Sequence, residues 1–488
     1  MSTQPDHAFQ NVAPHVQLPD YDRAAVKVGI VHVGVGAFHR SHEALYVDRL
    51  LAKDSQWGIC GVGVRPADSA TRDALVPQDG MYTLTTVDPH GHHEVRVVGS
   101  IVRYLHAPVD PEAVLEQMAD PAVRIVSLTI TEGGYGIDDA TGDFTPVDEA
   151  TRADMAGATV PTSVFGMIVE ALRRRRERGV EPFTVLSCDN VQHNGAVARR
   201  ALLAVADARD ADIGRWIAQN VSFPNSMVDR ITPGTTDAVR SSVAQEIGVE
   251  DRWPVRSESY LQWVLEDDFP TGRPDWEAAG VQLVTDVEPY ELMKLRLLNA
   301  SHQVMSYPAL LLGHTWVDDA CHDPQVAALL AGWMREARES LRPVPGVDLD
   351  DYCVTLIERF GSQAVRDTLA RQVVSSSDRL PKFVVPVMAA RDQGPPGSYG
   401  IFTLAAWSVW LSEAFATGGA EVVDGRREEL LAGVKREEAG EKAALLDLRS
   451  IFGEFGQDPQ VRTAYWQART NIRDNGVRSA LTSLLAID

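Results

Sequence analysis

The sequence predicts an α/β protein of two domains, a mostly parallel sheet domain followed by a mainly α-helical domain. Over the first 285 or so residues, short and nearly all-apolar runs alternate with helical patterns. A glycine-containing turn follows the first of these runs, and from about Glu288 onward only amphipathic helical patterns remain. Strands that are buried on both faces of a parallel sheet have this continuous apolar character. The predicted domains are residues 1–285 and 286–488.

The elements follow one another in a regular order. AAVKVGIVHVGVG is predicted to be a buried strand, FHRSHEALYVDRLL the helix after it, and WGICGVGVRPAD the second strand. YTLTTVDPHGHHEVRVVGS alternates around a turn and predicts a β-hairpin. IVSLTITEGGY and FTVLSCDN are further strands, each followed by a helix, and VSFPNSMVDRITP is extended. In the second domain, AALLAGWMREARESL and REELLAGVKREEAG are amphipathic helices.

The charge balance narrows the range of partners. Lys and Arg number 46 against 68 Asp and Glu, a formal net charge of −22. A chain this acidic repels phosphate backbones and anionic lipid, so neither nucleic acid nor a membrane is expected as a partner. The basic run Arg173–Arg176 ends a helical pattern, where cations suit the helix dipole, and is predicted to be a solvated helix end.

The cysteines and the apolar runs indicate a cytoplasmic protein. The four cysteines have no C-x-x-C spacing, which argues against a disulfide framework or a zinc module and suits a reducing compartment. The polar start resembles no signal peptide, and no apolar run approaches the roughly 18–20 residues that a membrane span needs.

The first glycine turn has the pattern of a dinucleotide site. Gly34 and Gly36 lie between a strand and a helix, where glycine lets backbone N–H groups approach a pyrophosphate. The third glycine of G-x-G-x-x-G is absent, because His39 occupies its position. The strand–turn–helix context nevertheless favours a Rossmann-type domain. The predicted phosphate-binding residues are Gly34, Val35, Gly36, Ala37 and Phe38.

An acidic residue at the end of the second strand is the candidate ligand of the adenosine ribose. Asp68 has this position, although it lies 68 − 36 = 32 residues after Gly36 rather than about 20. Its carboxylate could accept from two ribose hydroxyls, which favours NAD. Arg65 leaves NADP open, because a guanidinium can accept a 2′-phosphate. The alternative is that Asp68 only caps the helix SATRDAL.

Histidines near this region raise the question of a metal. His39 and His42 are three residues apart at a helix start, and His90, His92 and His93 cluster at the hairpin turn. Neither set has an H-E-x-x-H pattern or a cysteine beside it, and polar residues are ordinary at a turn. No metal site is therefore predicted.

The stretch MKLRLLNASH sets three polar groups into a leucine-rich helical pattern. At about 100° per residue, Lys294, Asn299 and His302 fall near 0°, 140° and 80°, so one side of an α-helix can present all three. A desolvated lysine can serve as the general base for oxidation of an alcohol, and a carboxamide can donate to the alkoxide-like oxygen. Glu291 could pass the proton to solvent. A snorkelling lysine, a helix-interior asparagine and a core histidine explain the segment equally well.

Further motifs extend this pattern over most of the chain. VGVGAFHRSHEALY, SLTITEGGY, SCDNVQHNG, FPNSMVDRITP, MKLRLLNASH and LPKF, with their intervening lengths, resemble the polyol-specific long-chain dehydrogenases. The resemblance implies a zinc-independent enzyme, often monomeric, that interconverts a sugar alcohol and its ketose with NAD. D-mannitol and D-fructose are the first expectation, with D-arabinitol as a possible second substrate.

The resemblance also implies roles for individual residues. Lys294 matches the family's general base, Asn190 and Asn299 its oxyanion donors, His302 a substrate-orienting position and Glu291 its proton-relay glutamate.

Other positions are implied to bind substrate and cofactor. Asp229 matches the junction of cofactor and substrate, and Arg371 and Arg379 match basic substrate-binding positions. Ala67 stands where relatives can carry a second acid beside Asp68, which weakens the preference for NAD.

Three alternatives remain at this point. A hexuronate reductase of the same superfamily, acting on fructuronate for example, would share the lysine and both asparagines, and the two arginines suit its carboxylate. A nucleotide-binding protein without turnover would bind cofactor and leave every polyol untouched. A metal-dependent alcohol dehydrogenase would lose activity with a chelator.

Overall fold

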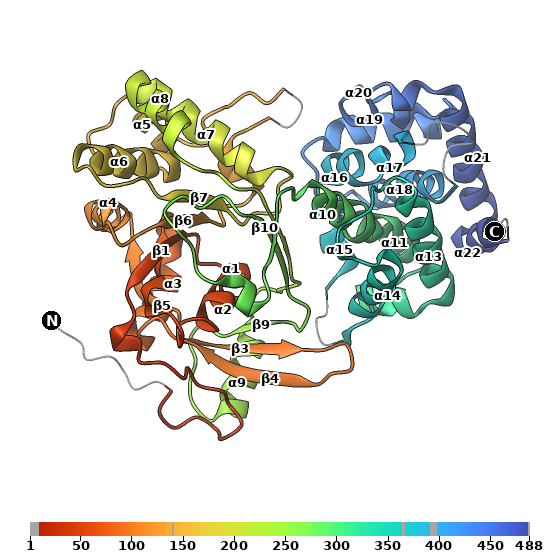
Figure 1. Cartoon of the computed structure of the whole chain (residues 1–488). Coiled ribbons are helices and arrows are strands. Elements are labelled where there is room, and N and C mark those ends of the chain that lie inside the picture. Colours follow the sequence, from red (N-terminus) through yellow and green to blue (C-terminus); the bar gives the residue numbers. More distant parts are fainter. Residues whose placement is uncertain (1–8, 139–140, 364–366, 391–397, 487–488) are drawn as a thin grey trace. The chain divides into compact units, whose positions relative to one another are not determined.

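The computed structural model describes residues 9–138, 141–363, 367–390 and 398–486 (Figure 1). The chain divides into two compact units. Unit 1 contains the described residues up to Asp88 together with His92–Glu288, and unit 2 contains Pro89–Gly91 and the described residues from Pro289 onward. Unit 1 is built on a parallel sheet and unit 2 is helical, so the predicted fold class is confirmed.

The main sheet of unit 1 has five parallel strands in the order β5-β2-β1-β6-β7. Its strands are β1 (Val28–Val33), β2 (Gly58–Gly63), β5 (Ile101–His106), β6 (Ile125–Leu128) and β7 (Thr184–Ser187). Side chains alternate between two hydrophobic cores: Val31 and Val33 belong to one, Ile30 to the other. Because both faces are covered, the strands carry mostly apolar residues, as the sequence indicated.

Helices of unit 1 cover one face of this sheet. Val114 of α4, Phe165 of α6 and Ala198 of α7 pack there with Val31. The helices of unit 1 are α1 (Ala37–Ser41), α2 (Glu43–Asp48), α3 (Ser69–Leu75), α4 (Pro111–Ala119), α5 (Glu149–Met155), α6 (Val164–Glu177), α7 (Asn194–Arg209), α8 (Ala211–Asn220) and α9 (Asp237–Ile247).

Two small sheets contribute to the other face. The predicted hairpin is confirmed as β3 (Tyr82–Val87) paired antiparallel with β4 (His93–Val98), in a sheet completed by β9 (Val255–Glu258). The second small sheet contains β8 (Ser226–Asp229), β10 (Gln262–Glu266) and β11 (Gln282–Val284). Leu84 of β3 and Trp263 of β10 pack into the same core as Ile30. The alternation of strands and helices in the sequence predicted that helices alone would cover this face. In the structure, strands of the two small sheets also cover it.

The predicted helix FHRSHEALYVDRLL is wrong in its continuity, because it is broken at His42. Residue 42 has φ −116° and ψ −96°, so α1 ends before it and α2 begins after it. The ring of His42 stacks on Phe38, with centroids 4.9 Å apart, and its Nε2 lies 3.0 Å from the carbonyl oxygen of Gln262. Tertiary contacts of this buried ring favour a bend where local propensity favoured a helix.

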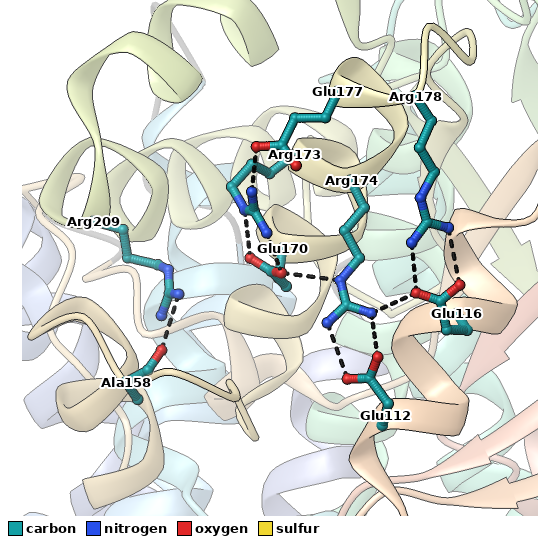
Figure 2. A network of polar contacts seen from close by, with 9 residues as sticks. All are labelled: Glu112, Glu116, Ala158, Glu170, Arg173, Arg174, Glu177, Arg178 and Arg209. Atoms are coloured by element: carbon teal, nitrogen blue, oxygen red, sulfur yellow. Dashed lines mark hydrogen bonds and ion pairs between the residues drawn. The ribbon is translucent and has the colours of Figure 1, made fainter.

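The basic run at the end of α6 is buried to an extent that the sequence did not predict. Figure 2 shows Arg174 bonded to Glu112 and Glu116 of α4 and to Glu170 of its own helix. Arg175 is 1% exposed, and its guanidinium donates to backbone carbonyls, including that of Asp120 at 2.8 Å. The prediction of a helix end is confirmed. Solvation is wrong for Arg174 and Arg175, which bond to α4 and the segment after it, whereas the side chains of Arg173 and Arg176 are 41% and 39% exposed.

Unit 2 is a helical assembly around α18. Its helices are α10 (Glu288–Met293), which begins at the unit boundary, α11 (Ala300–Leu311), α12 (Val317–His322), α13 (Pro324–Arg338), α14 (Leu349–Phe360), α15 (Leu369–Gln372), α16 (Ser376–Phe383), α17 (Val385–Ala389), α18 (Ser398–Ala416), α19 (Arg427–Glu438), α20 (Arg449–Phe452), α21 (Pro459–Asn475) and α22 (Val477–Leu485). Helix α18 is buried on nearly every side, and its Trp410 packs on Tyr307 of α11. None of the helices in the described ranges is sufficiently long and apolar to span a bilayer.

Candidate active site

The glycine turn after β1 requires glycine at position 34. Gly34 has φ +96°, and a Cβ built on it would lie 2.1 Å from the carbonyl oxygen of Thr129. Its N–H donates to the carbonyl of Val62 at 3.0 Å, so the turn is pressed between β2 and β6. A Cβ on Gly36 would meet nothing closer than 3.9 Å, which leaves the backbone open there. One glycine is thus a requirement of packing, and the other leaves room for a ligand.

The remaining residues of the predicted phosphate-binding segment continue from this turn. Val35 is buried in the core beneath the sheet, and α1 begins at Ala37 with Gly36 as its N-cap. Phe38 is half-buried. His39, in the place of the third glycine, is buried and stacks on His32 with ring centroids 3.5 Å apart.

A series of contacts between buried polar side chains, which the sequence did not predict, supports the turn at Gly34. In the middle of β1, His32 Nδ1 lies 2.9 Å from a carboxylate oxygen of Glu43, and Nε2 lies 2.9 Å from Thr129 Oγ1. Thr129 in turn donates to the carbonyl of Gly34 at 2.6 Å. The only signal in the sequence was a histidine inside the apolar run VHV. Polar groups buried in this way stabilise a structure only when they are bonded.

The histidines group differently from the pairing considered in the sequence. His39 lies with His32 and Glu43, and one ligand atom of each falls within 4.8 Å of the others. The two rings stack with an interplanar angle of 11°, so their nitrogen lone pairs point in parallel planes, whereas ligands of one metal ion must converge. At the hairpin, His93 pairs with Glu246 and His92 with Asp88. The absence of a metal site stays a prediction.

Asp68 lies in the 3-10 turn that follows β2, not at the end of the strand itself, and both of its carboxylate oxygens are bonded. One oxygen accepts from the N–H groups of Val64 and Arg65, each at 2.9 Å, and the other faces the Arg65 guanidinium at 3.2 Å. Asp68 precedes α3 but makes no side-chain bond to that helix, so the proposed capping of SATRDAL is wrong. The carboxylate instead closes the turn that leads out of β2. Arg65 is 77% exposed.

Asn190 is exposed at the carboxyl end of β7, and its neighbour Asp189 fixes the loops there. The Asp189 carboxylate accepts from the N–H groups of Ile130 and Thr131 and from the Tyr135 hydroxyl. Thr131 has φ +68°, a costly conformation for a β-branched residue. Asp189 therefore stabilises a strained loop beside a candidate catalytic residue. The acid was visible in SCDN, but nothing in the sequence indicated its partners.

Asp229 is the last residue of β8, in the small mixed sheet of β8, β10 and β11, and is buried. Its strand pairs with β10, where Asp229 is opposite Gln262. The next residue, Arg230, is also buried and donates to the carbonyls of Glu258 and Ser41. The end of β8 is therefore held by bonds to two other segments of unit 1.

In unit 2, the four residues predicted in MKLRLLNASH and just before it lie on one nearly continuous helical segment. Glu291 is in α10, and a π-helical stretch η7 (Lys294–Asn299) joins α10 to α11, which contains His302. The assumption of an α-helix through this stretch is wrong, so the angles derived from 100° per residue do not apply between Lys294 and Asn299. A π-helix bonds residue i to i+5 and is rare, and it occurs frequently at functional sites. It begins and ends at the two residues with predicted chemical roles.

These side chains are enclosed, and some of their polar atoms are left open. Glu291 is 5% and Lys294 8% exposed, whereas Asn299 and His302 are half-buried. Asn299 Nδ2 and His302 Nδ1 have no hydrogen-bond partner among the residues that the structure describes. Burial lowers the pKa of His302 to about 4, although the charge of Asp367 opposes the shift. His302 is therefore neutral near pH 7 and can bond a hydroxyl without adding charge.

Arg371 and Arg379 lie in the electrostatic environment of His302. Both act on its pKa, as do Arg359 and Asp367. Arg371 pairs with Asp367, and Arg379 donates to the carbonyl of Gln372 at 2.8 Å. The structure thus places the two predicted substrate-binding arginines close enough to His302 for their charges to lower its pKa.

Two protein-family models together match most of the chain. The mannitol dehydrogenase Rossmann domain matches residues 28–278, and the mannitol dehydrogenase C-terminal domain matches residues 286–472. The chain belongs to the mannitol dehydrogenase family. The first model spans the glycine turn and Asp68, and the second spans η7 and the arginines. The predicted family resemblance is confirmed.

Individual members of the mannitol dehydrogenase family are similar over nearly full length. A mannitol 2-dehydrogenase of Phaeosphaeria nodorum is 44% identical over 91% of this chain and 79% of its own, and one of Aspergillus fumigatus 41% over 96% and 95%. The Pseudomonas fluorescens mannitol 2-dehydrogenase, solved as a ternary complex with NAD and D-mannitol, is 42% identical with a TM-score of 0.86 over 98% of both chains. A D-sorbitol dehydrogenase, 38% identical, has a TM-score of 0.88 over 97% of this chain and 99% of its own.

As a family member, the chain has at the end of β1 the features that a dinucleotide requires. Gly34 has a positive φ, Gly36 leaves open backbone at the start of a helix, and Asp68 provides an acid in the turn after β2. These residues fit a bound NAD, whose pyrophosphate would lie at the turn and whose ribose hydroxyls would meet the acid.

Proposed function

We propose that this protein catalyses the metal-independent interconversion of D-mannitol and D-fructose with NAD as cofactor. The observation that carries the proposal is the π-helical stretch from Lys294 to Asn299, which sets a buried lysine and a carboxamide with an open N–H on one segment. Support comes from the similarity over nearly full length to a mannitol 2-dehydrogenase solved with NAD and D-mannitol.

Lys294 is assigned as the general base that takes the proton of the substrate hydroxyl. Its enclosure favours this role, since a lysine away from bulk water more readily becomes the neutral amine. Glu291, three residues earlier on α10, is assigned as the group that passes the proton on. In the reverse direction Lys294 returns the proton to the oxygen of the ketose.

Asn299 and Asn190 are assigned as donors to the oxygen that gains negative charge. Carboxamide N–H groups stabilise such an oxygen without adding a full charge. His302, neutral near pH 7, orients the substrate through a further hydroxyl, with Arg371 and Arg379 in the same part of unit 2.

The cofactor residues are assigned as Gly34, Val35, Gly36, Ala37, Phe38, Arg65, Asp68 and Asp229. When bound, NAD supplies the acceptor of the two electrons that leave the alcohol carbon. The open backbone at Gly36 receives the phosphates, and Asp68 receives the ribose hydroxyls. Because the second oxygen of Asp68 faces Arg65, loss of that pair would free a guanidinium for a 2′-phosphate. We therefore assign NAD as the preferred cofactor and NADP as the weaker one.

The test is the initial rate of NADH oxidation with D-fructose, with and without a chelator. Chelator-insensitive turnover that reverses with D-mannitol and NAD supports the proposal. D-sorbitol and D-arabinitol belong in the same panel, the first because a similar structure is a D-sorbitol dehydrogenase. No turnover of D-fructose, together with turnover of fructuronate, would replace the proposal by a hexuronate reductase. Loss of activity with the chelator would indicate a metal-dependent enzyme.

We further propose that the protein acts as a cytoplasmic monomer. The sequence supports this through dispersed cysteines and through a family resemblance to enzymes that are often monomeric. Light scattering coupled to size exclusion tests the oligomeric state, with the mass of one chain, 53.3 kDa, as the expected result.

A further inference from the structure

Among the described residues, the charged groups that most affect the pKa of His302 are three cations and one anion. Arg359, Arg371 and Arg379 contribute positive charge, and Asp367 contributes the negative charge. A surplus of guanidinium groups next to a substrate-orienting residue would ordinarily attract a carboxylate. Asp367, the acid of this group, therefore reduces the positive charge that a substrate meets.

Asp367 occupies the guanidinium fork of Arg371. Arg371 Nε donates to one carboxylate oxygen at 2.7 Å, and Nη2 donates to the other. This two-point geometry is the one a guanidinium would use for a substrate carboxylate. Burial alone would raise the pKa of Asp367, but its bond to Arg371 lowers it, so the acid stays ionised near pH 7.

Other bonds hold Asp367 in place independently of Arg371. Gln372 Nε2 donates to it at 2.7 Å, and the N–H of Thr368 donates at 2.8 Å. Thr368 caps the short helix α15, which contains both Arg371 and Gln372. The acid, the arginine and the amide therefore belong to one local structure, and a substrate cannot displace Asp367 without breaking it.

We infer that Asp367 is a specificity-determining residue that disfavours sugar acids by neutralising Arg371. A polyol or ketose needs only single bonds from hydroxyls and tolerates a paired arginine. A hexuronate would bring its carboxylate towards a fork that is already filled and towards the charge of Asp367. The inference rests on the proposed function, because it explains why a site with several arginines would prefer neutral sugars.

The test compares D-fructose with fructuronate in the parent protein and in Asp367→Asn. The asparagine keeps the shape and an acceptor for Thr368 but removes the charge. We expect the ratio of kcat/KM for fructuronate to that for D-fructose to rise by about tenfold or more, the scale of one weakened charge interaction. The inhibition constant of fructuronate against D-fructose should fall in parallel, which gives a readout even if fructuronate is not turned over.

Two further variants separate charge from structure. Asp367→Glu keeps the charge and should keep the discrimination, and Arg371→Gln added to Asp367→Asn should return the ratio towards that of the parent. Asp350→Asn is the matched control, because Asp350 forms a similar two-point pair with Arg338 and does not act on His302. Thermal unfolding identifies any variant that fails to fold.

The outcomes distinguish the inference from the proposed function. A parent protein that turns over D-fructose, with a ratio and an inhibition constant unchanged in Asp367→Asn, overturns the inference and leaves the function standing. A parent protein inert on D-fructose overturns the proposed function and the inference with it. An equal change in the Asp350→Asn control would also overturn the role of Asp367.

Discussion

Buried polar groups have different roles in two regions of the molecule. One is the nucleotide end of unit 1, which comprises the glycine turn after β1 with Asp68 and Asp189, and the other is the helical segment of unit 2 from α10 to α11. At the nucleotide end, Asp68 and Asp189 have their oxygens bonded to backbone N–H groups, and His32 supports the Gly34 turn through Thr129. In the segment from α10 to α11, Asn299 and His302 each keep a nitrogen without a partner among the described residues. The bonded groups hold the shape of the first region, although both ring nitrogens of its His39 also lack a hydrogen-bond partner among the described residues. In the second region the nitrogens without a partner belong to residues with predicted chemical roles.

This difference corresponds to what each region has to do. A cofactor site binds the same molecule in every cycle and benefits from a fixed, preorganised turn. The oxygen of the substrate changes its charge during the reaction, so its donors must be unengaged until the substrate arrives. Substitutions in the helical segment of unit 2 should therefore affect turnover most. Substitutions at the nucleotide end should affect cofactor affinity and stability.

The largest effect is expected for Lys294→Ala. Removing the general base should lower kcat for D-mannitol oxidation by roughly 10²–10⁴-fold, while the affinity for NADH stays within about twofold. Stopped-flow or steady-state rates and fluorescence titration of NADH measure the two quantities. Lys435→Ala, on an exposed position of α19, is the matched control and should change neither. Turnover at half the parent rate would remove Lys294 from the mechanism.

The next effect is expected for Asn299→Ala. Loss of one donor to a developing oxyanion typically lowers kcat by about 10²-fold. Because Asn299 Nδ2 has no partner among the described residues, its removal should leave the melting temperature nearly unchanged. A large loss of stability with proportionate loss of activity would mean that the carboxamide is structural, and the contrast between the two regions would fail.

The fold was predictable where burial alone dictates the pattern. Continuous apolar runs identified the strands of the parallel sheet, and the alternation around PHG identified the hairpin. The break at His42 was not predictable, since it depends on a carbonyl of Gln262, 220 residues away in the sequence. The ion pairs of Arg174 with Glu112 and Glu116 similarly join helices that are distant in the chain.

The candidate site was predictable to the extent that its residue types are unusual for their surroundings. A lysine, an asparagine and a histidine in a leucine-rich helix attracted attention, whereas Asp189 and Asp367 resembled ordinary loop acids. The π-helix could not be predicted, because hydrophobic periodicity hardly distinguishes one wide turn within a helix. Nothing in the sequence showed that His32 supports the glycine turn, because its partners Glu43 and Thr129 come from separate elements.

A smaller effect is expected for Asp68→Ala, which tests the nucleotide end. The variant should weaken binding of NAD by about tenfold and that of NADP less, because the acid is lost and Arg65 is released. It should also lower the free energy of unfolding by about 1–3 kcal/mol, since the N–H groups of Val64 and Arg65 lose their acceptor. Equal weakening for both cofactors would place ribose recognition on another residue.

In Asp68→Asn the side-chain oxygen can still accept from both of these N–H groups, because both bond to one carboxylate oxygen in the parent. Compared with Asp68→Ala, this variant should therefore recover part of the lost free energy of unfolding but little of the lost affinity for NAD. Isothermal titration of each cofactor and urea unfolding measure the two effects separately. Equal recovery of both would mean that Asp68 contributes to binding only by closing its turn.

The smallest expected effect is a pH dependence of stability due to His302. Its pKa is about 4 in the folded protein against 6.5 ordinarily, so between these values the unfolded chain binds the extra proton. Stability is therefore fully present above pH 6.5 and is lost as the pH falls towards 4. Between pH 7 and pH 5, His302→Gln should lose less stability than the parent, by roughly 1–2 kcal/mol, as measured by urea unfolding. His92→Gln, whose side chain is 84% exposed, should behave as the parent does. An identical loss in parent and His302→Gln would mean that the ring is protonated as readily as in water, and that the segment from α10 to α11 is not the enclosed environment that distinguishes it from the nucleotide end.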